Sequence, residues 1–178
     1  MRESGPKEQL QVARSGTASA AELSQLAESP WFFVREAVAN HPRTPQADLE
    51  RMLPTGAPSS DGWRMLRALL SNPSSPVGLL SRAAQQVLDE CEGVEPRDGE
   101  AMEALLALST CSRAPADRLL ELGDPERVPR HIRRRIAAPG CAVPLLERLA
   151  EDPSQQVAQR ARKALARTED SGGASDPE

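Results

Sequence analysis

Two prolines and a leucine recur at a constant spacing along this chain. In ANHPRTPQADLERML, which begins at Ala39, prolines stand three and six residues after the first residue, and a leucine stands ten after it. The same frame begins at Leu70, and it recurs from Ala13, Ser109 and Ile136 with other residues at some proline positions. The shared leucines lie 26, 31, 39 and 27 residues apart, and periods of this length are typical of stacked supersecondary units. These leucines are Leu23, Leu49, Leu80, Leu119 and Leu146.

Each unit contains two predicted helix starts. The first is a cap residue followed by proline, as in Thr44-Pro45 and Ser75-Pro76, where proline is expected at the first helical position because an amide there would have no partner. In the earliest unit, Ser19 and Glu22 form a capping-box pattern. The second start follows an Asp or Ser beside Pro or Gly, at residues 29–30, 61–62, 98–99, 124–125 and 152–153. Because neither short helix buries its apolar face alone, the units must stack. The sequence predicts an all-α fold, an α-solenoid of about five degenerate helical pairs.

The predicted repeat domain covers residues 10–167. Residues 1–9 are expected to form a flexible N-terminus, and residues 168–178, TEDSGGASDPE, have the composition of a disordered tail. The longest gap between shared leucines falls over about residues 85–99, QQVLDECEGVEPRDG. This acidic stretch is expected to loop out of the stack.

Composition limits the class of protein. Hydrophobic residues make up 39% of the chain and charged residues 27%, which is typical of a globular protein. Aromatic residues are scarce, so Leu, Ala, Val and Ile must build the core, and this favours close-packed helices over a sheet. No apolar run is long enough to span a membrane, and the N-terminal MRESGPKEQL lacks the apolar core of a signal peptide. We therefore expect a cytoplasmic protein that does not interact with a membrane.

The sequence offers little catalytic or metal-binding chemistry. Cys91, Cys111 and Cys141 stand at wide spacings without a CxxC pair, which supports neither a disulfide framework nor a zinc site. The two histidines, His41 and His131, fall on different faces of the repeat frame, so they do not assemble a nucleophile–base–acid set. No glycine-rich phosphate loop is present. We expect a protein that is not an enzyme and that carries no cofactor and no metal.

Two segments carry a resemblance to a known repeat. VREAVANHPRTPQADLERML and IAAPGCAVPLLERLAEDPSQQV resemble the leucine-rich repeat variant, a bacterial repeat with the pattern VR-x-x-VA-x-NP-x-TP-x-x-x-L-x-x-LA-x-D. DPSQQVAQRARKALA also resembles the second helix of a HEAT repeat, and the resemblance spans about residues 12–167. It implies an armadillo-type, right-handed superhelix of short helical pairs that serves as an interaction surface. Some members hold an iron–sulfur centre in an N-terminal cysteine cluster, but no cysteine here precedes Cys91, so that property is not transferred.

Arginines on the second helices are the candidate binding residues. In VPRHIRRRI, Val128, Ile132 and Ile136 stand four residues apart and form an inward stripe, so the neighbouring arginines are expected to face outward. Second helices usually line the concave wall of a solenoid. Charge is also segregated, because residues 86–126 carry eleven acids and three arginines whereas residues 127–167 carry ten bases and three acids. The candidate partner-binding set is Arg35, Arg67, Arg130, Arg133, Arg134, Arg160 and Lys163.

Several functions are compatible with this basic wall. The preferred hypothesis is recognition of a protein or peptide partner, and an acidic partner would suit the basic wall. The alternative is binding of nucleic acid or another polyanion through the same arginines. A third interpretation is a solvated face on which arginines pair with carboxylates such as Glu36, Glu147 and Glu151. An enzymatic role ranks last. The sequence pI near 5.4 weighs against non-specific nucleic-acid binding.

Trp31, Phe32 and Phe33 form the one aromatic cluster. Three consecutive residues of a helix cannot all face the core, so one ring is expected to be partly exposed. We interpret the cluster as a seal on the first unit, where no earlier repeat stacks, with a partner-binding hot spot as the alternative.

Overall fold

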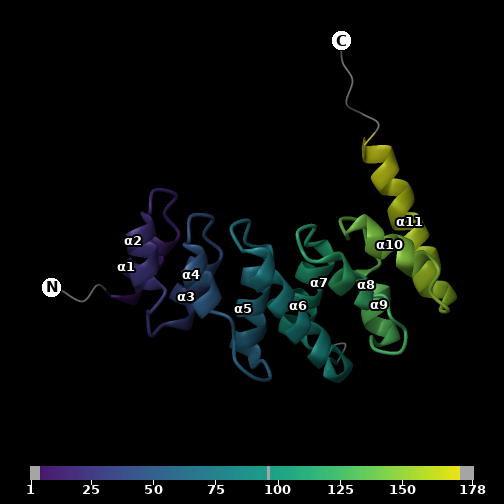
Figure 1. Ribbon diagram of the computed structural model, residues 1–178, viewed down its shortest axis with the longest axis horizontal. Helices are drawn as coiled ribbons and strands as arrows, with labels where there is room; N and C mark the ends of the chain where they lie inside the picture. Colours follow the sequence, from purple (N-terminus) through teal and green to yellow (C-terminus); the bar gives the residue numbers. More distant parts are fainter. Residues whose placement is uncertain (1–4, 96, 173–178) are drawn as a thin grey trace, which may run out of the picture.

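The computed structural model of the protein describes residues 5–95 and 97–172 (Figure 1). Within these ranges the chain forms α-helices and one 3-10 turn, with no strand. The helices are α1 (Pro6–Ala13), α2 (Ala20–Leu26), α3 (Phe32–Ala39), α4 (Gln46–Arg51), α5 (Ser60–Ser71), α6 (Val77–Glu90), α7 (Gly99–Thr110), α8 (Ala116–Glu121), α9 (Arg130–Ile136), α10 (Val143–Ala150) and α11 (Gln155–Gly172); the 3-10 turn η1 (Cys91–Gly93) follows α6.

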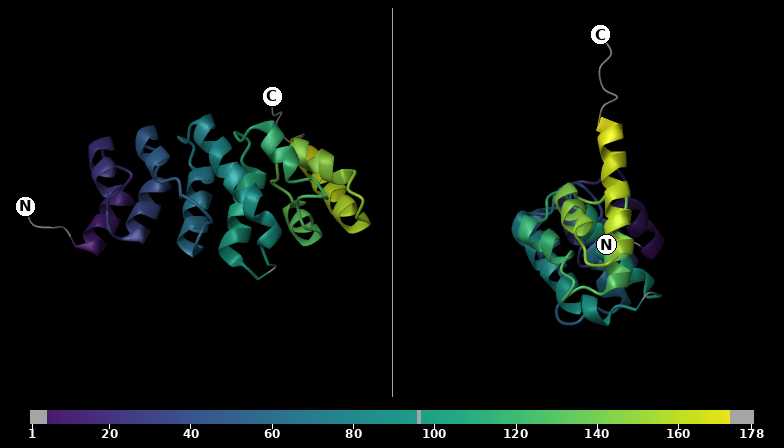
Figure 2. Two further views of the ribbon diagram at one scale, coloured as in Figure 1. Left: turned by 60° about the horizontal axis from the view of Figure 1, so that its bottom comes forward. Right: turned by 90° about the vertical axis from the view of Figure 1, so that its right-hand side faces the viewer.

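The helices form two layers. Each odd-numbered helix contacts the next odd-numbered helix, from α1 through α11, while α6 contacts α8 and α8 contacts α10 in the other layer. Successive pairs follow one another along the long axis of the molecule, and α11 extends beyond its neighbours (Figures 1 and 2). The pairs are α2–α3, α4–α5, α6–α7, α8–α9 and α10–α11, with α1 packed on α3 in front of them. The predicted α-solenoid of about five helical pairs is confirmed.

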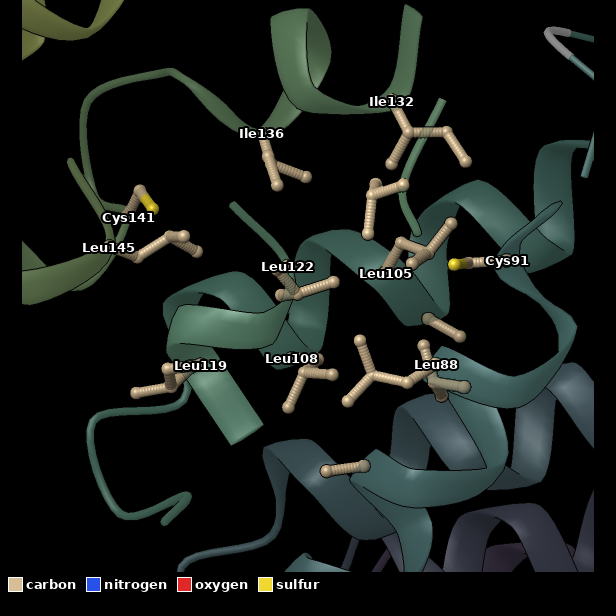
Figure 3. Close-up of a cluster of buried hydrophobic side chains, with 14 of the residues drawn as sticks. Leu88, Cys91, Leu105, Leu108, Leu119, Leu122, Ile132, Ile136, Cys141 and Leu145 are labelled. Atoms are coloured by element: carbon tan, nitrogen blue, oxygen red, sulfur yellow. The ribbon is translucent and has the colours of Figure 1, made fainter. Parts of the chain in front are cut away.

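The shared leucines occupy matching places in this stack. Each is the fourth residue of an even-numbered helix, and its N–H donates to the carbonyl four residues earlier, at the residue that precedes the helix. None of the five is more than 4% exposed. Figure 3 shows Leu119 among the apolar side chains of α6 to α10 that form the largest core cluster. The five leucines are Leu23, Leu49, Leu80, Leu119 and Leu146.

The prolines before the even-numbered helices lie one residue outside the predicted position. Pro45 and Pro76 precede the first helical residue and have extended ψ angles of 140° and 152°. The preceding hydroxyls do not cap the following helix; Thr44 Oγ1 donates to the Val38 carbonyl and Ser75 Oγ to the Leu69 carbonyl, each over 2.6 Å. They satisfy orphan carbonyls at the end of the helix before. The predicted capping box of Ser19 is confirmed, since its N–H donates to Glu22 Oε2 over 2.8 Å.

Hydrogen bonds between successive turns hold the units in register. His41 Nε2 donates to the Ser15 carbonyl over 3.1 Å, and Asn72 Nδ2 donates to the His41 carbonyl over 3.0 Å. Further along, Arg113 Nη2 donates to the Ser75 carbonyl over 2.8 Å. Each turn thus binds to the turn of the preceding unit, so backbone groups that helix ends leave unpaired find partners between repeats.

Helical structure extends further than the predicted boundaries. α1 begins at Pro6, so most of the described part of residues 1–9 is helical rather than flexible. The predicted loop at about 85–99 is wrong in extent, because α6 continues through Glu90 and η1 follows it. Acidic composition suggested a loop, but Ala83, Ala84, Val87 and Leu88 continue one buried stripe of α6. α11 reaches Gly172, and the rest of the predicted tail lies outside the described residues.

Two second-helix starts also differ from expectation. α9 begins at Arg130, so Val128 lies in the preceding turn, although it is buried with Ile132 and Ile136 as predicted. α5 begins at Ser60, so Asp61-Gly62 lies inside its first turn and Ser59 Oγ accepts from the Gly62 N–H.

Within the described ranges, no helix combines the length and apolar character that crossing a membrane requires.

Candidate functional site

A groove of about 420 Å³ crosses the odd-numbered layer near its C-terminal end. None of its lining residues is acidic, and its four arginines are all exposed. We call it the basic groove. Its lining residues are Met102 of α7, Arg130, His131, Arg134 and Arg135 of α9, and Arg160 of α11.

The helical repeat of α9 places these side chains together. Arg130 and Arg134 stand four residues apart, as do His131 and Arg135, so two adjacent strips of the helix face the groove. Ile132 lies on the opposite, buried strip. His131 is tied to the core side, because its Nε2 donates to the Val94 carbonyl over 3.0 Å.

α11 completes the groove. Arg160 Nε donates to the carbonyl of Ala137, just past the end of α9, over 3.0 Å, and this fixes the stem of the side chain. Lys163 is exposed three residues further along α11 and does not line the groove. Among the side chains that the structure describes, no carboxylate forms an ion pair with the four groove arginines or with Lys163. Four like charges in one hollow attract an anionic ligand.

Arg133 does not belong to the exposed set, which corrects the sequence-based prediction. It is 4% exposed, and its Nε and Nη2 donate to Asp152 Oδ2 and Oδ1 over 2.6 and 3.2 Å. Its Nη1 also donates to the Val128 carbonyl. Asp152 lies in the turn before α11, so the pair joins the last two units. Arg133 is therefore a structural residue that no partner can reach.

The remaining predicted arginines do not line the basic groove and have partners within the chain. Arg67 of α5 forms ion pairs with Glu36, over 3.1 Å, and with Glu103, over 2.6 Å. Arg35 Nη1 donates to the Ser29 carbonyl over 2.7 Å. Arg67 and Glu36 thus fit the interpretation in which arginines of the wall pair with carboxylates of the same chain. The arginines of the predicted set do not form one continuous row.

The structure adds three groove residues that the sequence-based set omitted. Arg135 stood in the same arginine run as Arg134, and the spacing of four from His131 was the one available signal. Met102 belongs to α7, and nothing in the sequence relates it to α9. The contact between these helices arises only when the units stack.

The aromatic cluster does not seal the stack. α1 packs against α3 in that place, whereas Trp31 and Phe33 remain 46% and 38% exposed, with ring centroids 6.2 Å apart. Two rings are therefore exposed where one was expected. Phe32 is half-buried beneath Arg64, whose guanidinium carbon lies 4.9 Å from the ring centroid.

The cysteines differ in their surroundings. Cys91 and Cys141 are buried and Cys111 is half-buried, and burial raises the pKa of the Cys91 and Cys141 thiols to about 11. A raised pKa keeps the thiol protonated, so roughly one thiol in a thousand is ionised at pH 8. Among the described residues, no group of three or more His, Cys, Asp or Glu side chains gathers in a way that could hold a metal ion.

We expect a disulfide reagent at pH 8 to modify Cys111 of the native protein first. Cys91 and Cys141 should react at least about a hundredfold more slowly, because the thiolate is the reactive form and both sulfurs are shielded. All three should react quickly in denaturant. With a reagent that releases a coloured thiolate, the absorbance over time measures the rate at which each thiol reacts. Cys111→Ser should abolish the fast phase of this reaction. Two fast thiols in the native protein would contradict the assignment.

Residues 32–54 match the family model of the leucine rich repeat variant. This segment contains α3, the turn at His41–Thr44 and α4, so it spans the junction between two successive pairs. The resemblance of VREAVANHPRTPQADLERML to that repeat is confirmed there. No curated protein and no solved structure matches the chain.

Proposed function

We propose that the protein is a non-catalytic helical-repeat scaffold of the cytoplasm that binds an acidic segment of a partner protein in the basic groove. One observation carries this proposal: Arg130, Arg134, Arg135 and Arg160 are exposed in one hollow that no acidic residue lines. Guanidinium groups bind carboxylates in a bidentate manner, so a run of Asp or Glu residues is a fitting ligand.

The limited extent of the positive surface favours a peptide over nucleic acid. α7 carries no basic residue, its Glu100 forms no ion pair with a described side chain, and its Glu103 pairs with Arg67. The unpaired arginines of the groove are therefore not continued along the odd-numbered layer at α7, where a longer polyanion would need them. No Phe, Tyr or Trp side chain lines the groove, whereas proteins that bind single strands commonly stack bases on such rings. A short acidic segment needs neither a long basic track nor stacking.

Affinity should be moderate and sensitive to salt. Exposed ion pairs contribute about 0.2–1 kcal/mol each, so four of them add up to at most about 4 kcal/mol. Added salt weakens them, because the Debye length falls from about 10 Å at 0.1 M to about 3 Å at 1 M. Contacts with the aliphatic stems of the groove arginines must supply the rest of the binding energy, because the apolar lining residue Met102 is only 2% exposed.

Fluorescence anisotropy with a labelled octaglutamate peptide tests the proposal. The native protein should bind at 50 mM salt and lose most of its affinity at 500 mM. Arg134→Glu with Arg135→Glu should weaken binding by about tenfold or more. The matched control is Arg14→Glu with Arg43→Glu, which changes the net charge equally at two exposed arginines outside the groove.

Two results would overturn the proposal. One is equal binding by the groove variant and the control, since the arginines of the groove would then make no difference. The other is tighter binding of a single-stranded oligonucleotide than of a peptide of equal charge at 150 mM salt, with the oligonucleotide no longer bound by the groove variant. That outcome would assign the groove to nucleic acid.

A further inference from the structure

An acidic surface lies where α6 passes through η1 into α7. It carries five carboxylates and one guanidinium, that of Arg97, so its formal charge is −4. Glu92 and Glu95 are exposed, and none of the five carboxylates forms an ion pair with a side chain that the structure describes. We call this surface the acidic corner. Its carboxylates are those of Glu90, Glu92, Glu95, Asp98 and Glu100.

The acidic corner adjoins the basic groove. Val94, in the middle of the corner, is buried, and its carbonyl accepts from His131 Nε2 over 3.0 Å. His131 itself lines the groove next to Arg130. Figure 1 shows the turn after α6 and the start of α9 at the same edge of the molecule. A surface of charge −4 therefore lies beside a groove with four guanidinium groups, and no ion pair joins the two among the described residues.

We propose that a second copy of this chain occupies the groove, with the acidic corner of each copy placed on the basic groove of the other. The proposal rests on the proposed function, because it uses the same groove and takes the corner as an acidic segment. A two-fold rotation brings each of two adjacent, oppositely charged patches onto its counterpart, so one interface contains the contact twice. The opposite formal charges match in size.

Self-association then controls access to the groove. A dimer covers Arg134 and Arg135 with the carboxylates of the second copy, so an acidic partner must displace that copy. Low protein concentration and high salt both favour the open monomer, since the contact is mainly electrostatic. The groove is thus occupied by a second copy until a partner with more carboxylates, or with better apolar contacts, competes.

Sedimentation equilibrium at 50 mM and 1 M salt tests the proposal with the full chain. The native protein should approach twice its mass of 19.2 kDa at low salt and return to the monomer at high salt. Two charge reversals should each give monomers at low salt: Arg134→Glu with Arg135→Glu in the groove, and Glu92→Arg with Glu95→Arg in the corner. The control, Arg14→Glu with Arg43→Glu, should dimerise like the native chain.

Mixing the two reversed variants is the decisive step. The groove variant keeps a corner of charge −4 but has a groove with no net charge, and the corner variant keeps a groove of charge +4 but has a corner with no net charge. An equimolar mixture should therefore form a dimer with one chain of each, because that dimer keeps one native contact and places the reversed residues of the two chains against each other. Circular dichroism checks that each variant is folded. If a charge reversal unfolds the chain, the neutral variants Arg134→Gln with Arg135→Gln and Glu92→Gln with Glu95→Gln replace the two charge-reversed variants. Each neutral variant should weaken dimerisation.

Several results would overturn the dimer. The native protein could remain a monomer at low salt up to 200 µM, or the single variants could still dimerise. The mixture of the two variants could stay monomeric. The measured mass could also grow beyond that of the dimer, which is what head-to-tail association would give. Failure of the proposed function looks different. Glu92→Gln with Glu95→Gln leaves the groove intact, so if this variant does not bind octaglutamate, the groove is not a peptide site, whatever the native mass.

Discussion

Arg133→Met is expected to lower the free energy of unfolding by about 3–5 kcal/mol, because it leaves the Asp152 carboxylate buried without its charged partner. Both side chains are nearly inaccessible, with 5% and 0% of their surfaces exposed. Asp152 would keep its hydrogen bond from the Ser154 N–H, but one amide does not replace a bidentate guanidinium. Urea denaturation followed by circular dichroism measures the change.

Arg134→Met is the matched control for this prediction. Arg134 is the next residue of the same helix, is exposed and has no carboxylate partner among the described side chains, so its replacement should change stability by no more than about 0.5 kcal/mol. Adding Asp152→Asn to Arg133→Met should recover part of the loss, since it removes the unpaired charge and keeps the side-chain shape. Equal effects of Arg133→Met and Arg134→Met would contradict the structural role of Arg133.

Leu119→Ala is expected to lower the free energy of unfolding by about 2–5 kcal/mol, whereas Leu120→Ala should lower it by less than about 1 kcal/mol. The two leucines are adjacent in α8, but Leu119 is 4% exposed within the core cluster of Figure 3 and Leu120 is 40% exposed. Urea denaturation of both variants measures the difference. A larger loss for Leu120→Ala would mean that the leucine frame does not mark the core.

Much of the architecture could be predicted because its signals are local. The residues from the start of the frame to its leucine cover the connection between two helices and the first turn of the next helix. Burial of the fourth helical residue follows from the 3.6-residue helical period. The match of residues 32–54 to the leucine rich repeat variant agrees with that frame. Local signals failed where composition and periodicity disagreed, as at Gln85 to Glu90, where acidic residues concealed the continued stripe of Val87 and Leu88.

Hydrogen-bond partners were less predictable than helices. Thr44 and Ser75 fit the pattern of a helix cap, but their hydroxyls bind carbonyls six residues earlier. Both directions satisfy an orphan backbone group, and the residue type does not distinguish them. The outcome depends on how closely the preceding helix approaches the turn, which the packing of the two layers sets.

The sequence by itself determined the spacing of helices and leucines, because steric restriction by proline and the helical period act over a few residues. Only the tertiary structure decided the fate of the arginines. Arg133, Arg134 and Arg135 are chemically identical and consecutive, yet Asp152 lies 19 residues away and buries the first, while Arg160 and Met102 form a groove with the other two. Charge pairing over such separations depends on which helices become neighbours, and that is a property of the stack rather than of any segment.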